Sequence, residues 1–245
     1  MITAEEWWSI LGAYNTAIFP MQIITIIVAA ILTYFLFAKP GTKTNSFIKA
    51  YLAFTFAWIG IVFYLILGKE LAGNYFWASL FIIIAILFVV DISAKRIEFR
   101  IPQTGWQKYL TIFLILCTFF YPLIGMLPGH YYPKMVMLGT FPCPTTAFAL
   151  TLLAAAIPKV DKKVYILLLF WAVPLPMFAQ IPRFGVYEDL IMFGAGIYSL
   201  IMLVKNWKVI GKETSMTPKG DTHEHENKIV FSYQINEYHS LKWKP

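Results

Sequence analysis

The chain has 245 residues, of which 59% are hydrophobic and 18% aromatic, while only 13% are charged. An ordinary soluble domain carries about 25% charged residues, and a soluble chain of this length could not bury so much apolar surface in one core. Composition therefore excludes an ordinary soluble domain and indicates a membrane protein. The formal net charge of +7 accompanies no pattern of interleaved basic and aromatic residues, so nucleic acid is not an expected partner.

Residues 1–17 are predicted to form an outer, interfacial amphipathic helix. Thr3 and Glu6 have the spacing of a capping box, with Thr3 as the N-cap. The apolar residues that follow recur at helical spacing: Trp7, Ile10, Leu11 and Tyr14. We expect this helix to lie along the outer membrane surface with its tryptophans at head-group depth. The alternative is a longer first span whose start is frayed.

Residues 18–204 are predicted to form the transmembrane domain. Apolar runs, most of them close to the roughly 20 residues that a spanning helix needs, alternate with short connections that hold Pro and Gly. The predicted spans are 18–38, 47–67, 75–91, 109–127, 142–157, 164–181 and 186–204. The expected fold class is therefore all-α, a polytopic membrane helix bundle of seven transmembrane helices.

The placement of lysine and arginine predicts the orientation of these spans. Thirteen basic residues fall on one side: Lys39, Lys43, Lys49, Lys95, Arg96, Arg100, Lys108, Lys159, Lys162, Lys163, Lys205, Lys208 and Lys212. Three fall on the other side: Lys69, Lys134 and Arg183. The positive-inside rule then places the N-terminus outside and the C-terminus in the cytoplasm. The expected location is the bacterial cytoplasmic (inner) membrane, with the lipid bilayer as a partner.

The fifth span opens with PCPTT, residues 142–146, which has two interpretations. Proline is harmless in a first helical turn, and the threonine hydroxyls can serve unpaired backbone groups, so the stretch can simply start a helix. Alternatively, the helix dipole favours a thiolate at Cys143, which would then be a redox thiol, a metal ligand or part of an anion site. Cys117 lies midway along the fourth span, too far for a disulfide, so two unpaired cysteines are expected.

Further polar residues gather at the same outer level. The candidate ligand-binding residues of an outer pocket are His130, Cys143, Thr145, Thr146, Gln180, Arg183, Glu188 and Asp189. Carboxylates in a first helical turn also favour the helix dipole, which gives Glu188 and Asp189 a structural explanation. One cysteine, one histidine and two carboxylates are permitted zinc ligands. They lack metal-site spacing, however, so the sequence predicts no metal and no cofactor, and no catalytic residue is assigned.

Within the spans, charged groups lie only near the ends: Lys49 and Asp91 near the cytoplasmic ends, and Glu188 and Asp189 in the first turn of the seventh span. This distribution argues against a proton relay or a charge-coupled transporter that uses side chains. Pro174-Leu175-Pro176 should break or kink the sixth span. Small residues that indicate close helix packing recur in the fifth and seventh spans: Ala147, Thr151, Ala155, Gly194, Ala195, Gly196 and Ser199.

The last segment, 205–245, is predicted to be a polar cytoplasmic tail. The run HEHE at 223–226 is interpreted as solvated charge, with metal contact as the alternative. Ile229, Phe231, Tyr233 and Ile235 alternate with more polar residues, as in a short strand or docking segment. This tail is where a cytoplasmic partner is expected to bind. Whether the protein forms a homo-oligomer is left open.

Three blocks together resemble a known family. They are Tyr14-Asn15 with Pro20 and Gln22, then GTFPCPTT at 139–146, then GVYEDL at 185–190 followed by Ala195-Gly196. They resemble an uncharacterised bacterial multi-pass membrane family, domain of unknown function 6064. The resemblance covers about residues 14–203 and implies a shared membrane fold, without a reaction, substrate or cofactor.

Three functions follow from these features. The favoured one is a transport, channel-like or sensory module with an outer-facing polar pocket for a small ligand. The second is a membrane-embedded enzyme or metal site that uses Cys143, His130, Glu188 and Asp189. The third is a non-catalytic scaffold or accessory subunit of a membrane complex. Gathering of the outer polar residues in one cavity would favour the first two, and an enzyme is not the leading interpretation.

Overall fold

The computed structural model describes residues 2–210, and every regular element in this range is a helix. The elements are α1 (Ala4–Ala17), α2 (Met21–Ala38), α3 (Thr42–Trp58), η1 (Ile59–Leu67), α4 (Asn74–Ala94), α5 (Trp106–Phe119), α6 (Tyr121–Gly125), α7 (Pro142–Ala156), α8 (Lys162–Ala172), η2 (Pro176–Gln180), α9 (Ile181–Phe184) and α10 (Asp189–Lys205). The predictions for residues 211–245, including HEHE at 223–226 and the alternating segment at 229–235, lie outside the described residues.

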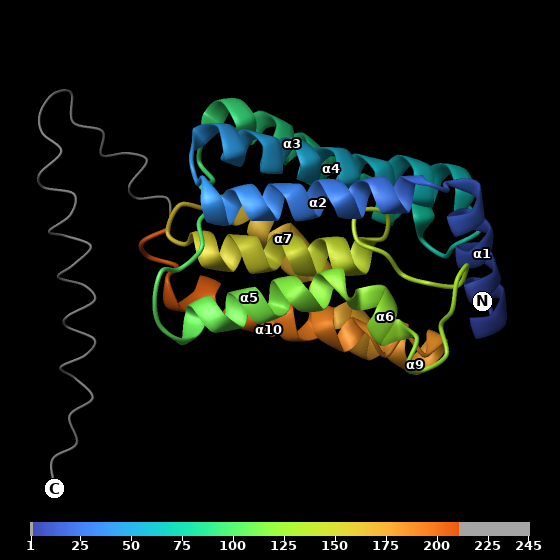
Figure 1. Cartoon of the computed structure of the whole chain (residues 1–245). Coiled ribbons are helices and arrows are strands. Elements are labelled where there is room, and N and C mark those ends of the chain that lie inside the picture. The colour runs from blue at the N-terminus through green and yellow to red at the C-terminus, as the bar shows by residue number, and fades with distance from the viewer. Residues whose placement is uncertain (1, 211–245) are drawn as a thin grey trace, which may run out of the picture. The chain divides into compact units, whose positions relative to one another are not determined.

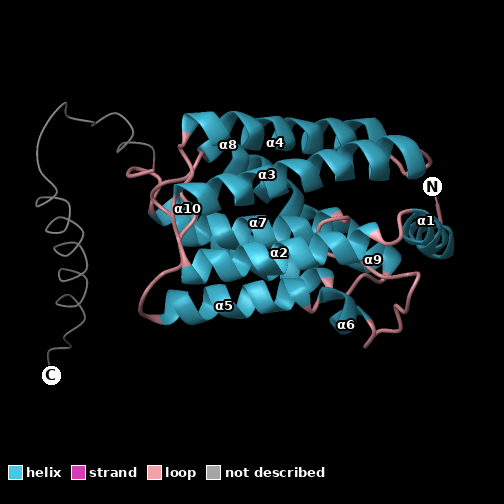
Figure 2. Ribbon diagram, turned by 45° about the horizontal axis from the view of Figure 1, so that its top comes forward, coloured by secondary structure: helices cyan, strands magenta, loops and turns pink. Residues whose placement is uncertain are grey.

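Helix α1 is separate from the first long helix. The predicted capping box is confirmed: the Glu6 N–H donates to Thr3 Oγ1 at 3.2 Å, and the Thr3 N–H donates to Glu6 Oε2 at 2.7 Å. The hydrogen bond from the Thr3 backbone lowers the pKa of the Glu6 carboxyl. The helix ends at Ala17, and the next one begins at Met21. In Figures 1 and 2, α1 lies across one end of the other helices.

The remaining long helices run side by side, with α7 among them (Figure 1). All fifteen residues of α7 are buried, and it packs chiefly against α10 and α5. Its small side chains allow this close approach. The Thr151 hydroxyl donates to the Ala147 carbonyl at 2.8 Å within the helix, while Ser199 of α10 donates to the Leu150 carbonyl at 3.1 Å. An amphipathic stripe is absent from α7 because it has no outward face.

Predicted close packing along α10 is confirmed on one of its faces. Ala195, Gly196 and Ser199 are buried. A Cβ atom on Gly196 would lie 3.1 Å from the Cβ of Ala172, so glycine lets α10 approach α8. Gly194 differs, because a Cβ there would meet nothing within 4 Å.

Helix length and composition are those of a membrane protein. Four stretches are long and apolar enough to cross a membrane: Met21–Ala38, Thr42–Leu67, Asn74–Ala94 and Lys162–Phe184. Helices α5 and α7 are shorter apolar helices. The outer surface of α2 exposes Ile23, Ile27 and Ile31, each about half accessible. An all-helical bundle with candidate membrane-spanning helices is therefore confirmed.

Two of the long stretches are irregular. Regular α-helix ends at Ala172, and the chain continues as the π-helix η2 from Pro176, which confirms the break predicted at Pro174-Leu175-Pro176. Helix α3 continues into a second π-helix, η1. Here Gly60 permits close contact with α4, since a Cβ atom on it would lie 2.8 Å from Ile82 Cγ1.

The loops that carry most of the basic residues meet at the bundle end that is opposite α1 (Figure 1). Lys49 Nζ lies 2.7 Å from Asp91 Oδ2, and both side chains are buried. Asp91 also accepts hydrogen bonds from the backbone N–H groups of Arg96 and Ile97 at 3.0 and 3.1 Å. The Arg96 guanidinium in turn lies 3.1 Å from Asp161. The buried ion pair therefore ties α3 and α4 to the loop that follows α4.

Substitution Lys49→Met should destabilise the protein, because it leaves the Asp91 carboxylate buried without its cation. Removal of one partner of a buried pair costs about 3–5 kcal/mol. A thermal melt of the purified protein in detergent measures the loss. The matched control is Glu98→Gln, which breaks the exposed Glu98–Lys159 pair and should cost at most about 1 kcal/mol. Equal melting temperatures for the two variants would contradict the assigned role of Asp91.

Candidate functional site

The segment that leads into α7, residues 128–141, is held in place by hydrogen bonds from α1 and α2. Asn15 Nδ2 donates to the carbonyls of Pro133 and Met135 at 2.6 and 2.7 Å. The Tyr14 hydroxyl donates to the Thr140 carbonyl at 2.9 Å, and Thr25 donates to the Leu138 carbonyl at 3.1 Å. These buried donors fix where α7 begins and therefore fix the position of Cys143.

Thr145 takes part in this anchoring. Its hydroxyl accepts from the Gly139 N–H at 2.9 Å and donates to the Phe141 carbonyl at 2.6 Å. Gly139 has φ +88°, and a Cβ atom there would lie 2.5 Å from the Thr25 Cβ, so this position requires glycine. The prediction that a threonine hydroxyl of PCPTT serves backbone groups is therefore confirmed at Thr145. Thr146 is fully buried, and its hydroxyl has no hydrogen-bond partner among the described residues.

Glu188 is paired with His130 from the loop after α6. His130 Nδ1 lies 3.0 Å from Glu188 Oε1 and 3.1 Å from Oε2. A Cβ atom on Gly125 would lie 2.9 Å from the same Oε1, so glycine makes room for the carboxylate. The Trp8 ring contacts His130 with centroids 3.8 Å apart and planes tilted by 32°, and its indole N–H donates to the Phe184 carbonyl at 2.9 Å. Helix α1 thus covers this pair.

Asp189 forms a second buried polar contact, with α6 and α7. Its Oδ1 accepts a 2.5 Å hydrogen bond from the Tyr121 hydroxyl, and both side chains are fully buried. The Cys143 thiol lies beside Asp189 and Trp171. Asp189 Oδ2 and Trp171 Nε1 are nevertheless without a hydrogen-bond partner among the described residues. Buried polar atoms without partners are costly and rare in proteins.

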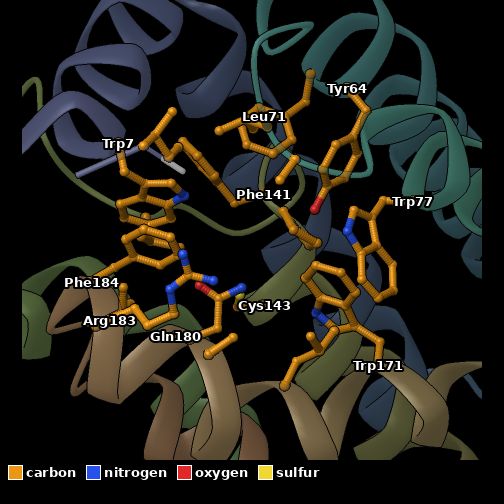
Figure 3. A pocket seen from close by; sticks show the side chains of 18 residues that line it. Trp7, Tyr64, Leu71, Trp77, Phe141, Cys143, Trp171, Gln180, Arg183 and Phe184 are labelled. Carbon is orange, nitrogen blue, oxygen red and sulfur yellow. The ribbon is translucent and has the colours of Figure 1, made fainter. Parts of the chain in front are cut away.

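A pocket of about 240 Å³ adjoins Cys143 (Figure 3). Its polar lining includes Cys143, Gln180 and Arg183, all of which the sequence predicted. Its aromatic lining consists of Trp7, Phe63, Tyr64, Trp77, Phe141, Trp171 and Phe184. The polar and aromatic side chains together come from α1, η1, α4, α7, α8, η2 and α9 and from the loop before α7. We call this space the aromatic pocket.

Several polar groups face the aromatic pocket. Figure 3 shows the hydroxyl of Tyr64 and the indole nitrogen of Trp171 directed toward its interior. Trp171 is 2% exposed, and its Nε1 has no partner among the described residues. Gln180 Oε1 is likewise buried without a partner there. A mostly apolar pocket with a few convergent polar groups is the usual form of a small-molecule site.

The structure therefore groups the predicted site residues in three ways. Cys143, Gln180 and Arg183 line the aromatic pocket, and Asp189 lies behind Cys143. His130 and Glu188 form their own pair under Trp8. Thr145 and Thr146 face the protein interior.

Sequence reasoning missed the aromatic residues of the site, above all Trp171, Tyr64 and Tyr121. The aromatic content of 18% was the available signal, but it did not indicate which rings would meet.

The metal alternative finds no support in the described part of the chain. Among residues 2–210, no group of three or more His, Cys, Asp and Glu side chains is arranged to hold a metal ion. The physical reason is that His130 faces Glu188, whereas Cys143 faces Asp189 from another side. Both Cys117 and Cys143 are free thiols.

These features define an all-helical bundle of membrane-type helices with an aromatic pocket at the α1 end. The chain belongs to DUF6064, a family of unknown function, whose family model matches residues 4–213. No curated protein and no solved structure matches the chain.

Substitution Gly139→Ala should displace the loop before α7, because the new methyl group would collide with Thr25. The matched control is Gly129→Ala, which has φ +104° but meets nothing within 4 Å. The control loses only the backbone freedom of glycine, about 1–2 kcal/mol, so its melting temperature in detergent should fall less than that of Gly139→Ala. Identical melting temperatures would show that Gly139 is not held against α2.

Proposed function

We propose that this protein is a seven-span protein of the bacterial inner membrane, with its N-terminus outside, that binds a small ligand in the aromatic pocket. In this proposal it works as a transport or sensory module. The observation that carries the proposal is the aromatic pocket itself, with the buried and unpartnered Trp171 Nε1 and Gln180 Oε1 on its wall. A ligand would supply the missing partners.

Exposed aromatic residues at both ends of the bundle support a transmembrane placement. Near the basic loops, the exposed rings are Trp106, Tyr109 and Trp207; near the α1 end, they are Tyr75, Tyr131, Tyr132 and Tyr187. Tryptophan and tyrosine concentrate at the two membrane–water interfaces. Exposed apolar side chains on α2, such as Ile27, lie between these ends, where they would meet lipid.

Seven crossings follow if α5 with α6, α7 and α10 span as well as the four longer stretches. Helix α7 has only fifteen residues, fewer than the roughly 20 that a lipid-facing span needs. It is enclosed by other helices, so its length need not match the hydrocarbon thickness. The basic end then faces the cytoplasm by the positive-inside rule, and α1 and the aromatic pocket face outward.

An enzymatic role is less well supported by the geometry. A nucleophilic thiol is usually activated by a neighbouring imidazole or a cationic group. Here His130 is bonded to Glu188, whereas Cys143 lies beside the Asp189 carboxylate. The arrangement offers a lined cavity more directly than an activated nucleophile.

Site-directed labelling tests the orientation. In a Cys117→Ser/Cys143→Ser background, Tyr131→Cys and Lys163→Cys each add one thiol at an exposed position. A membrane-impermeant maleimide should label Tyr131→Cys on intact spheroplasts, and Lys163→Cys only after permeabilisation. Labelling of Lys163→Cys alone on intact spheroplasts would reverse the orientation, and equal labelling of both would contradict separate bundle ends.

Reaction of Cys143 tests the aromatic pocket. In full-length Cys117→Ser protein, a small methanethiosulfonate reagent should reach Cys143 through this pocket. Ala179→Phe places a ring in the pocket lining and should slow the reaction about fivefold or more. Met177→Phe, an exposed position on the same π-helix, is the control and should leave the rate unchanged. If Cys143 did not react, or if its modification rate were the same in Ala179→Phe and Met177→Phe, the proposal that a ligand can enter the pocket would be wrong.

A further inference from the structure

We infer that the ligand of the aromatic pocket is a small organic acid: a carboxylate on a flat, apolar body of about one ring. This inference rests on the proposed function, because it names the chemistry of the ligand for the same pocket.

The carrying observation is the excess of hydrogen-bond donors in the pocket wall. The Trp171 indole nitrogen can only donate, is buried and has no partner among the described residues. The Tyr64 hydroxyl, a second donor, points into the same space (Figure 3). Among the described residues, Gln180 contributes an unpartnered acceptor, its Oε1. An occupant that satisfies this wall must therefore present acceptor atoms.

Charge in the lining favours an anionic acceptor over a neutral one. Arg183 lines the pocket with a guanidinium group that stays protonated at any physiological pH. Its Cζ atom lies over the Phe184 ring, 5.6 Å from the ring centroid, so the positive charge lies against one of the aromatic rings of the pocket. Arginine binds carboxylates with short, charge-assisted hydrogen bonds. The carboxyl group of Asp189 lies beside Cys143 and is outside the pocket lining.

Aromatic walls alone would also suit a quaternary ammonium ion. That ligand has no acceptor for Trp171 Nε1, and it would approach the charge of Arg183. The cation is therefore disfavoured on two separate counts.

Volume and wall shape set the body of the ligand. A cavity of about 240 Å³ corresponds to roughly eight water volumes, which is about one substituted ring. The walls are flat rings: Trp7 stacks on Phe184 at 4.9 Å, and Trp77 meets Trp171 edge-on at 5.0 Å. Flat aromatic walls prefer a flat apolar partner.

Three probes of similar size separate these contributions: benzoate, benzamide and benzyltrimethylammonium. Binding to the purified full-length protein in detergent at pH 7 is followed by tryptophan fluorescence and by protection of Cys143 from the thiol reagent in the Cys117→Ser variant. Benzoate should bind and protect Cys143 at a concentration at least tenfold lower than benzamide, and the cation should do neither.

Substitutions in the pocket wall test which donor side chains bind the probes. Arg183→Gln should reduce benzoate affinity to that of benzamide, whereas Trp171→Phe should weaken both probes about fivefold or more. Met177→Phe should change neither affinity, and a thermal melt checks that each variant is folded.

Preference for benzamide or for the cation, or unchanged benzoate affinity in folded Arg183→Gln protein, would overturn the carboxylate inference and leave the pocket in place. Failure of all three probes would also overturn it. The proposed function is tested separately, because the rates of Cys143 modification in Ala179→Phe and Met177→Phe require no ligand.

Discussion

Helix α7 has no face toward lipid or water, and its alanines and threonines let α5 and α10 approach it closely. Two other features of the bundle accompany this enclosure: the partners of its hydroxyl groups and the exposed apolar surface of α2. Hydroxyl groups that would be exposed elsewhere are bonded within or between helices, as with Thr151 to Ala147 and Ser199 to Leu150. Helix α2, in contrast, exposes a row of isoleucines.

Because α7 is enclosed, the place where it begins matters for the candidate site. The preceding loop is fixed by Asn15 and Tyr14 of α1, and Gly139 fits against α2. Cys143 therefore emerges between a buried carboxylate on α10 and a ring on α8. The aromatic pocket lies where α8 loses its regular helix after Ala172, and Leu175, Ala179 and Gln180 of the following segment line it.

Apolar runs, prolines and capping signals predict the helices well, because they depend on local chemistry. The capping box at Thr3, the start of α7 at Pro142 and the break after Ala172 all follow from such local rules. Family membership was also predictable from short blocks such as GTFPCPTT. Lysines placed on alternate loops predicted which loops meet at the end that holds Asp91 and Asp161.

The candidate functional site was predictable only in part, because it depends on which helix faces pack against each other. His130 and Glu188 are 58 residues apart, and their pairing depends on the space beside Gly125. In a helix that is apolar on every side, periodicity does not indicate where Trp171 points. The backbone role of the Thr145 hydroxyl was predictable from its place in a first helical turn, whereas its particular partner, the Gly139 N–H, was not.

Ile2 and Trp7 line the aromatic pocket, so the segment from Ile2 into α1 forms part of its wall. Any peptide fused ahead of Ile2 would be attached close to that wall. An affinity tag attached there would compete with a ligand for the aromatic pocket. Binding measurements should therefore use a tag at the C-terminus.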